Sequence, residues 1–213
     1  MIKIFVGTSP NGEDDVAEKT LKYSLEKHSS EPLDIIFMRN TPEGFMGSFD
    51  SRRWATPFTN LRWAIPEYCS FSGRAIYMDV DQLNLKDIAE LYNVDLKGRG
   101  FAARDNRLCV MVFDCEKMEP LLAPVSVIKK KSTYGNDNYK RFLQSATNID
   151  PRWNCLDGEG RPIEDIWHLH FTSMPTQPWK PSWFKGQHRP HPRKDLVQLW
   201  ESYRDEALES LNM

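Results

Sequence analysis

Long apolar runs and cysteines are both scarce in this sequence. Within its 213 residues, no apolar stretch approaches the ~20 residues that span a bilayer, and the first residues lack a basic region followed by a long apolar one. The 4 cysteines are widely spaced without a C-x-x-C pair, which favours neither a zinc knuckle nor a disulfide framework. We therefore expect a cytoplasmic protein with free thiols and no transmembrane segment.

The sequence also lacks an excess of one charge, repeats and low-complexity tracts. Lys and Arg total 28 against 30 Asp and Glu, a net charge of −2, so no global field recruits nucleic acid or an anionic membrane. Hydrophobic residues make up 40% and aromatic residues 12%, which provides enough apolar surface to offset the chain entropy lost on folding. This composition predicts a folded globular protein.

The order of its segments predicts an α/β fold with a central sheet. Apolar runs rich in β-branched or aromatic residues predict strands, at residues 3–8, 33–38, 74–79, 100–104 and 108–114. Helices are expected after the turn at 9–12 and at 59–69, 85–91 and 193–211. An Asp15-x-x-Glu18 capping box should open the first helix, and an apolar stripe from Leu196 to Leu211 should pack the last one on the domain.

The segment Ile76–Asp81 is an apolar strand that leads into two carboxylates, Asp79 and Asp81. Ligand sites of α/β sheets lie beyond the carboxyl ends of strands. Alternate side chains of an extended segment share a face, so both acids can reach one hard divalent cation. The alternative is structural: Asp79 ends a strand and Asp81 caps the next helix. The D-x-D spacing alone does not decide between them.

A second cluster lies in the strand-like segment 167–171, where His168 and His170 fall on one face. Either histidine can add a nitrogen ligand to the two carboxylates, and a mixed oxygen and imidazole shell suits Mn²⁺ or another first-row ion better than Ca²⁺. A histidine beside an apolar strand is more often a hydrogen-bonded structural residue. The case for a ligand therefore depends on its pairing with Asp79 and Asp81.

Residues 167–194 contain no Asp or Glu but several basic residues, a composition compatible with a local phosphate site. The alternative is a solvated loop whose tryptophans anchor it to the core. That alternative is preferred for Arg189 and Arg193, whereas both interpretations stay open for Lys180, next to Trp179.

Taken in order, several short motifs resemble glycosyltransferase family 8, which includes glycogenin and the bacterial lipopolysaccharide galactosyl- and glucosyltransferases. The motifs are Ile4–Thr8, Arg62-x-x-Ile65-Pro66-Glu67, Tyr77-Met78-Asp79-Val80-Asp81, Asp87–Leu91, Trp153-Asn154, and His170-Phe171-Thr172 followed by Pro178-Trp179. Single motifs are weak, but their shared order is specific and spans most of the chain.

The resemblance implies a GT-A fold, with 1–213 as one glycosyltransferase domain that has a nucleotide-binding half (1–115) and an acceptor half with the C-terminal helix (116–213). It implies a metal-dependent, retaining hexosyltransferase with a nucleotide-sugar donor, usually UDP-linked, and a glycan or other hydroxyl acceptor. Asp79, Asp81 and His170 would hold Mn²⁺ or Mg²⁺, and Arg62 would be a catalytic cation near the donor. The other implied nucleotide-sugar-binding residues are Val6, Gly7, Thr8, Val80 and Thr172.

The sequence departs from the family pattern in its sugar and diphosphate motifs. Gln177 aligns with the lysine that binds the diphosphate, and we predict that Lys180 replaces it as a catalytic and donor-binding cation. Asp105-Asn106-Arg107 stands in place of N-[AS]-G, and only Asn136-Asp137-Asn138 corresponds to D-Q-D. The nucleotide and metal half of the site is better kept than the sugar half.

Two other functions are compatible with parts of the sequence. Asp79-Val80-Asp81-Gln82-Leu83 loosely matches the D-x-D-x-[TV] of haloacid dehalogenase-type phosphatases, but two strands precede it and no convincing acidic pair follows. A non-catalytic nucleotide-sugar-binding protein on the same fold is the second alternative. The identity of the acceptor and the existence of a homo-oligomer stay open, because acceptor contacts come from loops that vary freely.

Overall fold

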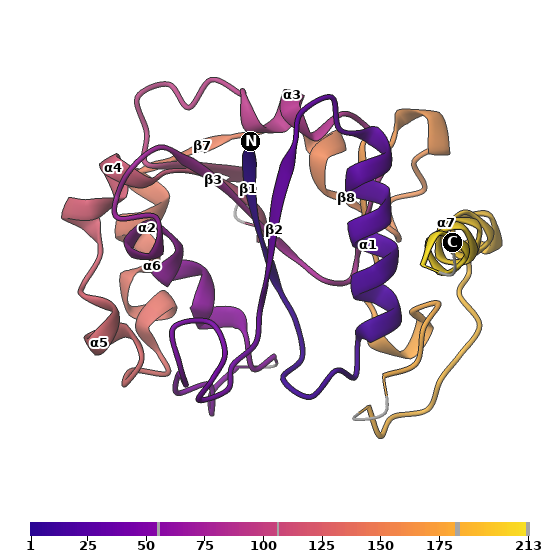
Figure 1. Ribbon diagram of the computed structural model, residues 1–213, viewed down its shortest axis with the longest axis horizontal. Coiled ribbons are helices and arrows are strands. Elements are labelled where there is room, and N and C mark those ends of the chain that lie inside the picture. Colours follow the sequence, from indigo (N-terminus) through magenta and orange to yellow (C-terminus); the bar gives the residue numbers. More distant parts are fainter. Residues whose placement is uncertain (55, 106, 182–183, 212–213) are drawn as a thin grey trace. The chain divides into compact units, whose positions relative to one another are not determined.

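The computed structural model describes residues 1–54, 56–105, 107–181 and 184–211 (Figure 1). They form two compact units that alternate along the chain. The first unit contains 1–11, 31–79 and 89–150, and the second contains 12–30, 80–88 and the residues from 151 onward. The single-domain assignment of 1–213, with halves at 1–115 and 116–213, stays a prediction.

The first unit is built on a mixed six-stranded sheet, and the apolar runs predicted five of its strands. Its strand order is β2 (Leu33–Met38), β1 (Ile2–Gly7), β3 (Arg74–Asp79), β6 (Arg107–Asp114), β5 (Phe101–Arg104) and β7 (Ala146–Asn148). β1 pairs in parallel with both β2 and β3, whereas β6 runs antiparallel to β3 and β5. The central strands are buried on both faces, which is why they read as continuous apolar runs.

Short helices accompany this sheet: α2 (Ile65–Tyr68), α4 (Cys115–Met118), α5 (Val125–Ile128) and α6 (Tyr134–Gln144) (Figure 1). The helix predicted at 59–69 begins as a 3₁₀ helix, Thr59–Ala64, and continues as α2, whose first turn contains Pro66. Proline is tolerated there because the first turn needs no N–H donor from it. A second 3₁₀ helix follows α4 at Glu119–Leu121. Trp63 stacks on Phe142 with ring centroids 4.1 Å apart, and this contact joins the 3₁₀ helix to α6.

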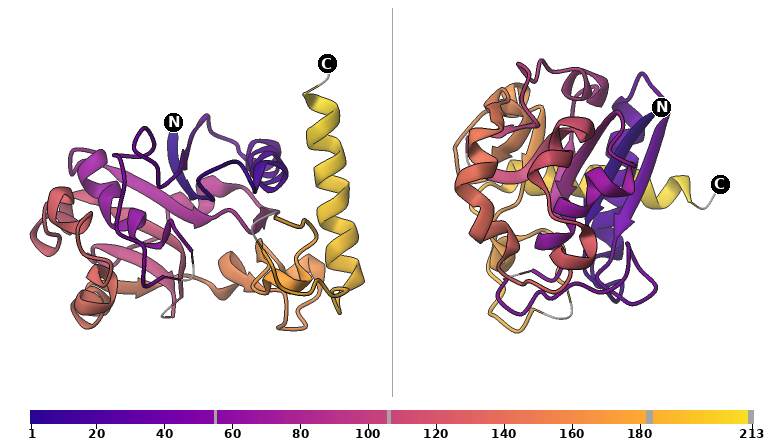
Figure 2. Two further views of the ribbon diagram at one scale, coloured as in Figure 1. Left: turned by 90° about the horizontal axis from the view of Figure 1, so that it is seen from below. Right: turned by 90° about the vertical axis from the view of Figure 1, so that its left-hand side faces the viewer.

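The second unit combines two long helices with a three-stranded sheet. The helices α1 (Asp15–His28) and α7 (Lys194–Ser210) pack against each other, and Figure 2 shows α7 as one continuous helix. The sheet has the order β4 (Gln82–Asn84), β9 (His168–His170) and β8 (Cys155–Leu156), with β9 antiparallel to β4 and parallel to β8. Short 3₁₀ helices lie at Pro151–Asn154, Ile163–Asp165 and Met174–Thr176.

Three local expectations are wrong in detail. The first helix has Asp14 at its N-cap without a side-chain cap, because the Asp14 carboxylate accepts the indole N–H of Trp179 at 3.1 Å. Leu211 is 61% exposed and lies outside the packed stripe of α7. The helix expected from residue 85 begins only at Ile88, as α3 (Ile88–Tyr92). Within the described residues, no helix is long and apolar enough to cross a membrane.

Candidate functional site

The first acid of the D-x-D motif, Asp79, ends strand β3 and belongs to the first unit. Its Oδ1 accepts the phenolic hydroxyl of Tyr77 and lies 3.4 Å from a terminal guanidinium nitrogen of Arg62. The Arg62 guanidinium also lies 4.4 Å from the centroid of the Tyr77 ring. Burial raises the pKa of Tyr77 well above its ordinary value, so the phenol keeps the proton that it donates to Asp79. The carboxylate of Asp79 is thus held by one cation and one hydroxyl donor.

Arg62 is buried, and its guanidinium contacts two backbone carbonyls as well as Asp79. Its Nε donates to the carbonyl of Thr59 at 2.8 Å, and a terminal nitrogen donates to the carbonyl of Leu108. Arg62 also lines a cavity of about 200 Å³ in the first unit, whose other lining residues are Trp54, Thr59, Trp63, Leu108, Gly135, Asn136 and Tyr139. The structure therefore places the predicted catalytic arginine beside Asp79 and at the wall of a cavity.

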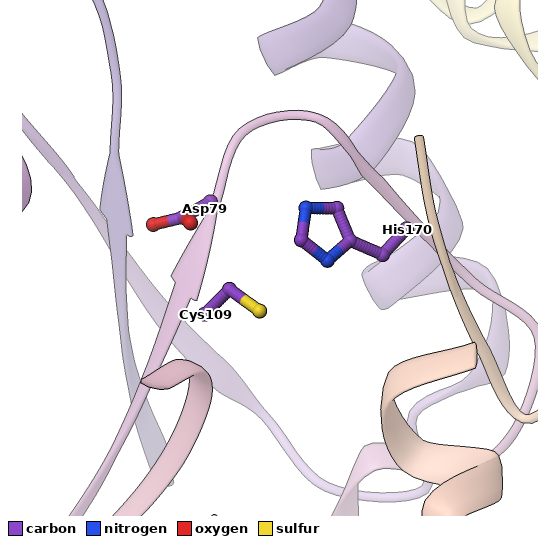
Figure 3. A group of neighbouring side chains, drawn as sticks. All are labelled: Asp79, Cys109 and His170. Atoms are coloured by element: carbon purple, nitrogen blue, oxygen red, sulfur yellow. The ribbon is translucent and has the colours of Figure 1, made fainter. Parts of the chain in front are cut away.

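Cys109 is a neighbour of Asp79 that the sequence analysis missed. The antiparallel register of β3 and β6 pairs Met78 with Val110, so the next residues, Asp79 and Cys109, lie across from each other. The Cys109 sulfur and an Asp79 carboxylate oxygen are within 4.8 Å of one another, and Figure 3 shows both side chains. Asp79 and Cys109 are neighbours because of the register between β3 and β6, and this register cannot be read from a single sequence.

The second acid, Asp81, belongs to the second unit and is separated from Asp79 in the chain by Val80 alone. Its carbonyl accepts the backbone N–H of Phe171 at 2.9 Å, which aligns this segment with the end of β9. Asp81 Oδ1 lies 3.3 Å from Nε2 of His170, and Asp81 Oδ2 lies 3.5 Å from the amide nitrogen of Gln177. Within the described residues, Asp81 Oδ1 is buried and accepts no hydrogen bond.

The two histidines of β9 differ in what their ring nitrogens face. Both nitrogens of His168 lie against amide oxygens, Nδ1 at 3.2 Å from Asn84 and Nε2 at 2.7 Å from Gln82. Burial lowers the pKa of His168 to about 3, so its ring is neutral. In His170, Nδ1 faces Oδ1 of Asn154 at 3.2 Å and Nε2 faces Asp81. His168 is thus a structural histidine, and only His170 directs a nitrogen at an acid.

The groups around Asp81 fit a divalent cation. An amide oxygen only accepts hydrogen bonds, so in a neutral ring the contact with Asn154 favours the proton on Nδ1 of His170 and leaves Nε2 as the metal-binding nitrogen. Nε2 lies 3.3 Å from a buried carboxylate oxygen of Asp81 that accepts no hydrogen bond among the described residues. Two acceptors at this distance require positive charge beside them, either a cation or a second proton on the ring. Carboxylate oxygen with imidazole nitrogen is a donor set suited to Mn²⁺ and related ions.

The residues predicted to line the nucleotide pocket differ in accessibility. Val6, Thr8 and Val80 are buried. A Cβ on Gly7 would lie 2.7 Å from both the Phe58 ring and the Tyr77 hydroxyl, so side-chain packing also requires glycine there.

Thr172, another residue of the predicted nucleotide set, is exposed. Its hydroxyl donates at 2.8 Å to Asp157, whose other carboxylate oxygen lies 2.9 Å from His191 Nε2. The bond holds the residues that follow His170. Thr172 is therefore an anchored residue of the predicted site.

Lys180 is exposed and lines a groove of about 270 Å³ in the second unit. Gln177 lines the same groove, and its amide nitrogen is the group 3.5 Å from Asp81 Oδ2. Arg189 lines the groove as well, although the sequence analysis preferred a solvated loop for it, whereas Arg193 instead pairs with Asp195. The first unit therefore gathers Arg62 and Asp79, and the second gathers Asp81, His170 and Gln177.

Comparison with known proteins identifies the fold. A scan against protein-family models gives no match, and a sequence search of curated proteins gives none either. Solved structures do match. They include the bifunctional glycosyltransferase WbbM (14% identity, TM-score 0.63), the glycosyltransferase GlyE of Streptococcus pneumoniae TIGR4 (17%, 0.64) and the galactosyltransferase LgtC with donor and acceptor sugar analogues (12%, 0.64).

The chain has the GT-A fold. The match covers 84% of this chain for WbbM and 96% for both GlyE and LgtC, and it confirms the predicted α/β class with a mixed central sheet and a C-terminal helix. The chain spans 46% of the length of WbbM, 61% of GlyE and 96% of LgtC. At these identities the likeness establishes the fold, and membership of family 8 stays a prediction.

Proposed function

We propose that this chain is a metal-dependent glycosyltransferase that moves a hexose, with retention of configuration, from a UDP-linked donor to a hydroxyl acceptor. The observation that carries the proposal is the pair Asp81 and His170, in which a carboxylate oxygen without a donor faces a ring nitrogen at 3.3 Å. This pair follows the strand end that carries Asp79, within a fold shared with glycosyltransferases. Ligand sites at such strand ends are typical of α/β sheets.

Asp79, Asp81 and His170 would hold Mn²⁺ or Mg²⁺, and the bound ion would act as a Lewis acid on the departing diphosphate. The side chains of the two units would have different tasks. Tyr77 and Arg62 fix the orientation of the Asp79 carboxylate. Lys180, on a flexible stem in the groove beside Gln177, would supply the cation that Gln177 lacks. Buried Val6, Gly7 and Thr8 would offer backbone groups to the nucleotide.

The experiment measures sugar release from UDP- and GDP-hexoses with and without Mn²⁺, together with binding of the same donors by calorimetry. Mn²⁺-dependent sugar release in the wild type, absent from Asp81→Asn, supports the transferase. Binding without turnover on any acceptor would instead support the non-catalytic nucleotide-sugar-binding protein. Phosphate released from a phosphomonoester, with no donor binding, would overturn the proposal.

A further inference from the structure

Asn154 contacts the His170 ring on the side of Nδ1, within the second unit. It ends the 3₁₀ helix Pro151–Asn154 that leads into β8, and its side chain is fully buried. β8 runs parallel to β9 with Leu156 opposite His170, and the N–H of Asp157 donates to the His170 carbonyl at 3.0 Å. This backbone pairing fixes the separation between Asn154 and the His170 ring. The contact from Asn154 Oδ1 to His170 Nδ1, 3.2 Å long, is therefore set by the sheet.

We propose that Asn154 is a positioning residue that selects the His170 tautomer with the proton on Nδ1 and so presents Nε2 to a divalent cation. This inference rests on the proposed metal site and extends it to a residue that contacts neither metal nor donor. A group that accepts the second ring proton of a metal-ligating histidine fixes both the tautomer and the ring orientation. Without that acceptor, the neutral ring would carry its proton on Nε2, beside the Asp81 carboxylate, and that nitrogen would be lost as a ligand.

The same sheet contains a matched control. Asn84 is also fully buried, and its Oδ1 lies 3.2 Å from Nδ1 of His168. The two asparagines thus make the same contact with histidines two residues apart on β9. Nε2 of His168, however, faces Gln82 and not an acid. Replacing Asn84 therefore tests what the loss of a buried amide does to the sheet without altering the His170 contact.

The experiment compares Asn154→Leu, Asn154→Asp and Asn84→Leu in the full chain. The ¹⁵N shifts of the His170 ring in metal-free protein report the tautomer, and calorimetry without donor reports Mn²⁺ affinity. Asn154→Leu should move the proton to Nε2 and weaken Mn²⁺ binding about 10- to 100-fold. Asn154→Asp keeps an acceptor, so it should keep the Nδ1 proton and bind Mn²⁺ at least as tightly as the wild type. Asn84→Leu should leave both readouts unchanged.

Two results would overturn the proposal: a neutral His170 ring that keeps its proton on Nδ1 in folded Asn154→Leu, or a neutral ring with its proton on Nε2 in Asn154→Asp. The second variant decides the matter if Asn154→Leu does not fold, as judged by circular dichroism. If the wild type binds neither Mn²⁺ nor Mg²⁺, the proposed function fails with its metal site. The ring shifts of the metal-free protein then still decide whether Asn154 sets the tautomer.

Discussion

The two acids of the D-x-D motif are separated by a single residue in sequence, but their carboxylates have different partners. Asp79, in the first unit, accepts a hydroxyl from Tyr77 and has the Arg62 guanidinium at 3.4 Å, so its charge is already balanced. Asp81, in the second unit, has a buried oxygen that lies 3.3 Å from Nε2 of His170 and accepts no hydrogen bond within the described residues. An acid that is already paired gains little from a metal. In the proposed metal site, we therefore expect Asp81 to contribute more to metal affinity than Asp79.

The largest effect is expected from Asp81→Asn, which removes the charge that faces His170 and keeps the size of the side chain. Mn²⁺ affinity should fall at least 100-fold, about 2.7 kcal/mol, in calorimetry without donor. Asp79→Asn should lose less than about tenfold, because Arg62 and Tyr77 already satisfy much of that carboxylate. Equal losses in the two variants would contradict the comparison of their environments.

Lys180→Ala tests whether the second unit, which contains Asp81, also provides the cation for the leaving diphosphate. One preorganised donor to developing charge contributes about 100-fold to kcat, on the order of 3 kcal/mol. We expect Lys180→Ala to lower kcat by about that factor and to change the donor KM much less, as for an interaction that strengthens in the transition state. Lys185→Ala is the matched control and should be close to neutral. If kcat fell strongly in Lys185→Ala and stayed unchanged in Lys180→Ala, the roles of the two lysines would be reversed.

Arg62→Lys tests the other half of the comparison, that the first unit holds Asp79. A lysine cannot reproduce the contacts of Arg62 with Thr59, Leu108 and Asp79, so the free energy of unfolding should fall by about 2–3 kcal/mol in urea. Arg99→Lys is the control, because Arg99 is exposed and its guanidinium donates only to the carbonyl of Gln144 among the hydrogen bonds described. Its loss should stay within about 0.5 kcal/mol. Equal losses would show that Arg62 does not hold Asp79 in place.

Long apolar runs were readable from the sequence because burial on both faces leaves a strong local pattern. β2 and β3 match the predicted strands 33–38 and 74–79, and β1 differs by one residue at each end. β4, β7 and β8 were missed, since they have only three, three and two residues and depend on pairing with β9 or β5. Such short strands carry no period of their own, so only tertiary contacts define them.

The candidate site shows the same division between local pattern and long-range contact. Asp81 was identified by residue type and spacing and His170 by the resemblance to family 8, and the structure brings the two together within one unit. Cys109 and the role of Asn154 were not predictable, because each depends on a partner in another strand. Asp14 also escaped prediction as the acceptor for Trp179, which is 165 residues away in the chain. The sequence therefore identifies residues with suitable chemistry, whereas the contacts of those residues depend on the fold.

Cys109→Ser is expected to have the smallest effect on Mn²⁺ affinity. It tests whether the first unit, which contains Asp79, provides a sulfur ligand. Mn²⁺ prefers oxygen and imidazole ligands, whereas thiolates favour softer ions such as Zn²⁺. If Asp81 and His170 are the principal ligands, replacing the Cys109 sulfur, which lies within 4.8 Å of Asp79, with a hydroxyl should change Mn²⁺ affinity less than about threefold. Calorimetry with Mn²⁺ and Zn²⁺ on the same variant separates the two cases. A Mn²⁺ loss as large as that of Asp81→Asn would make Cys109 a principal ligand and move the centre of the metal site to the side of Asp79.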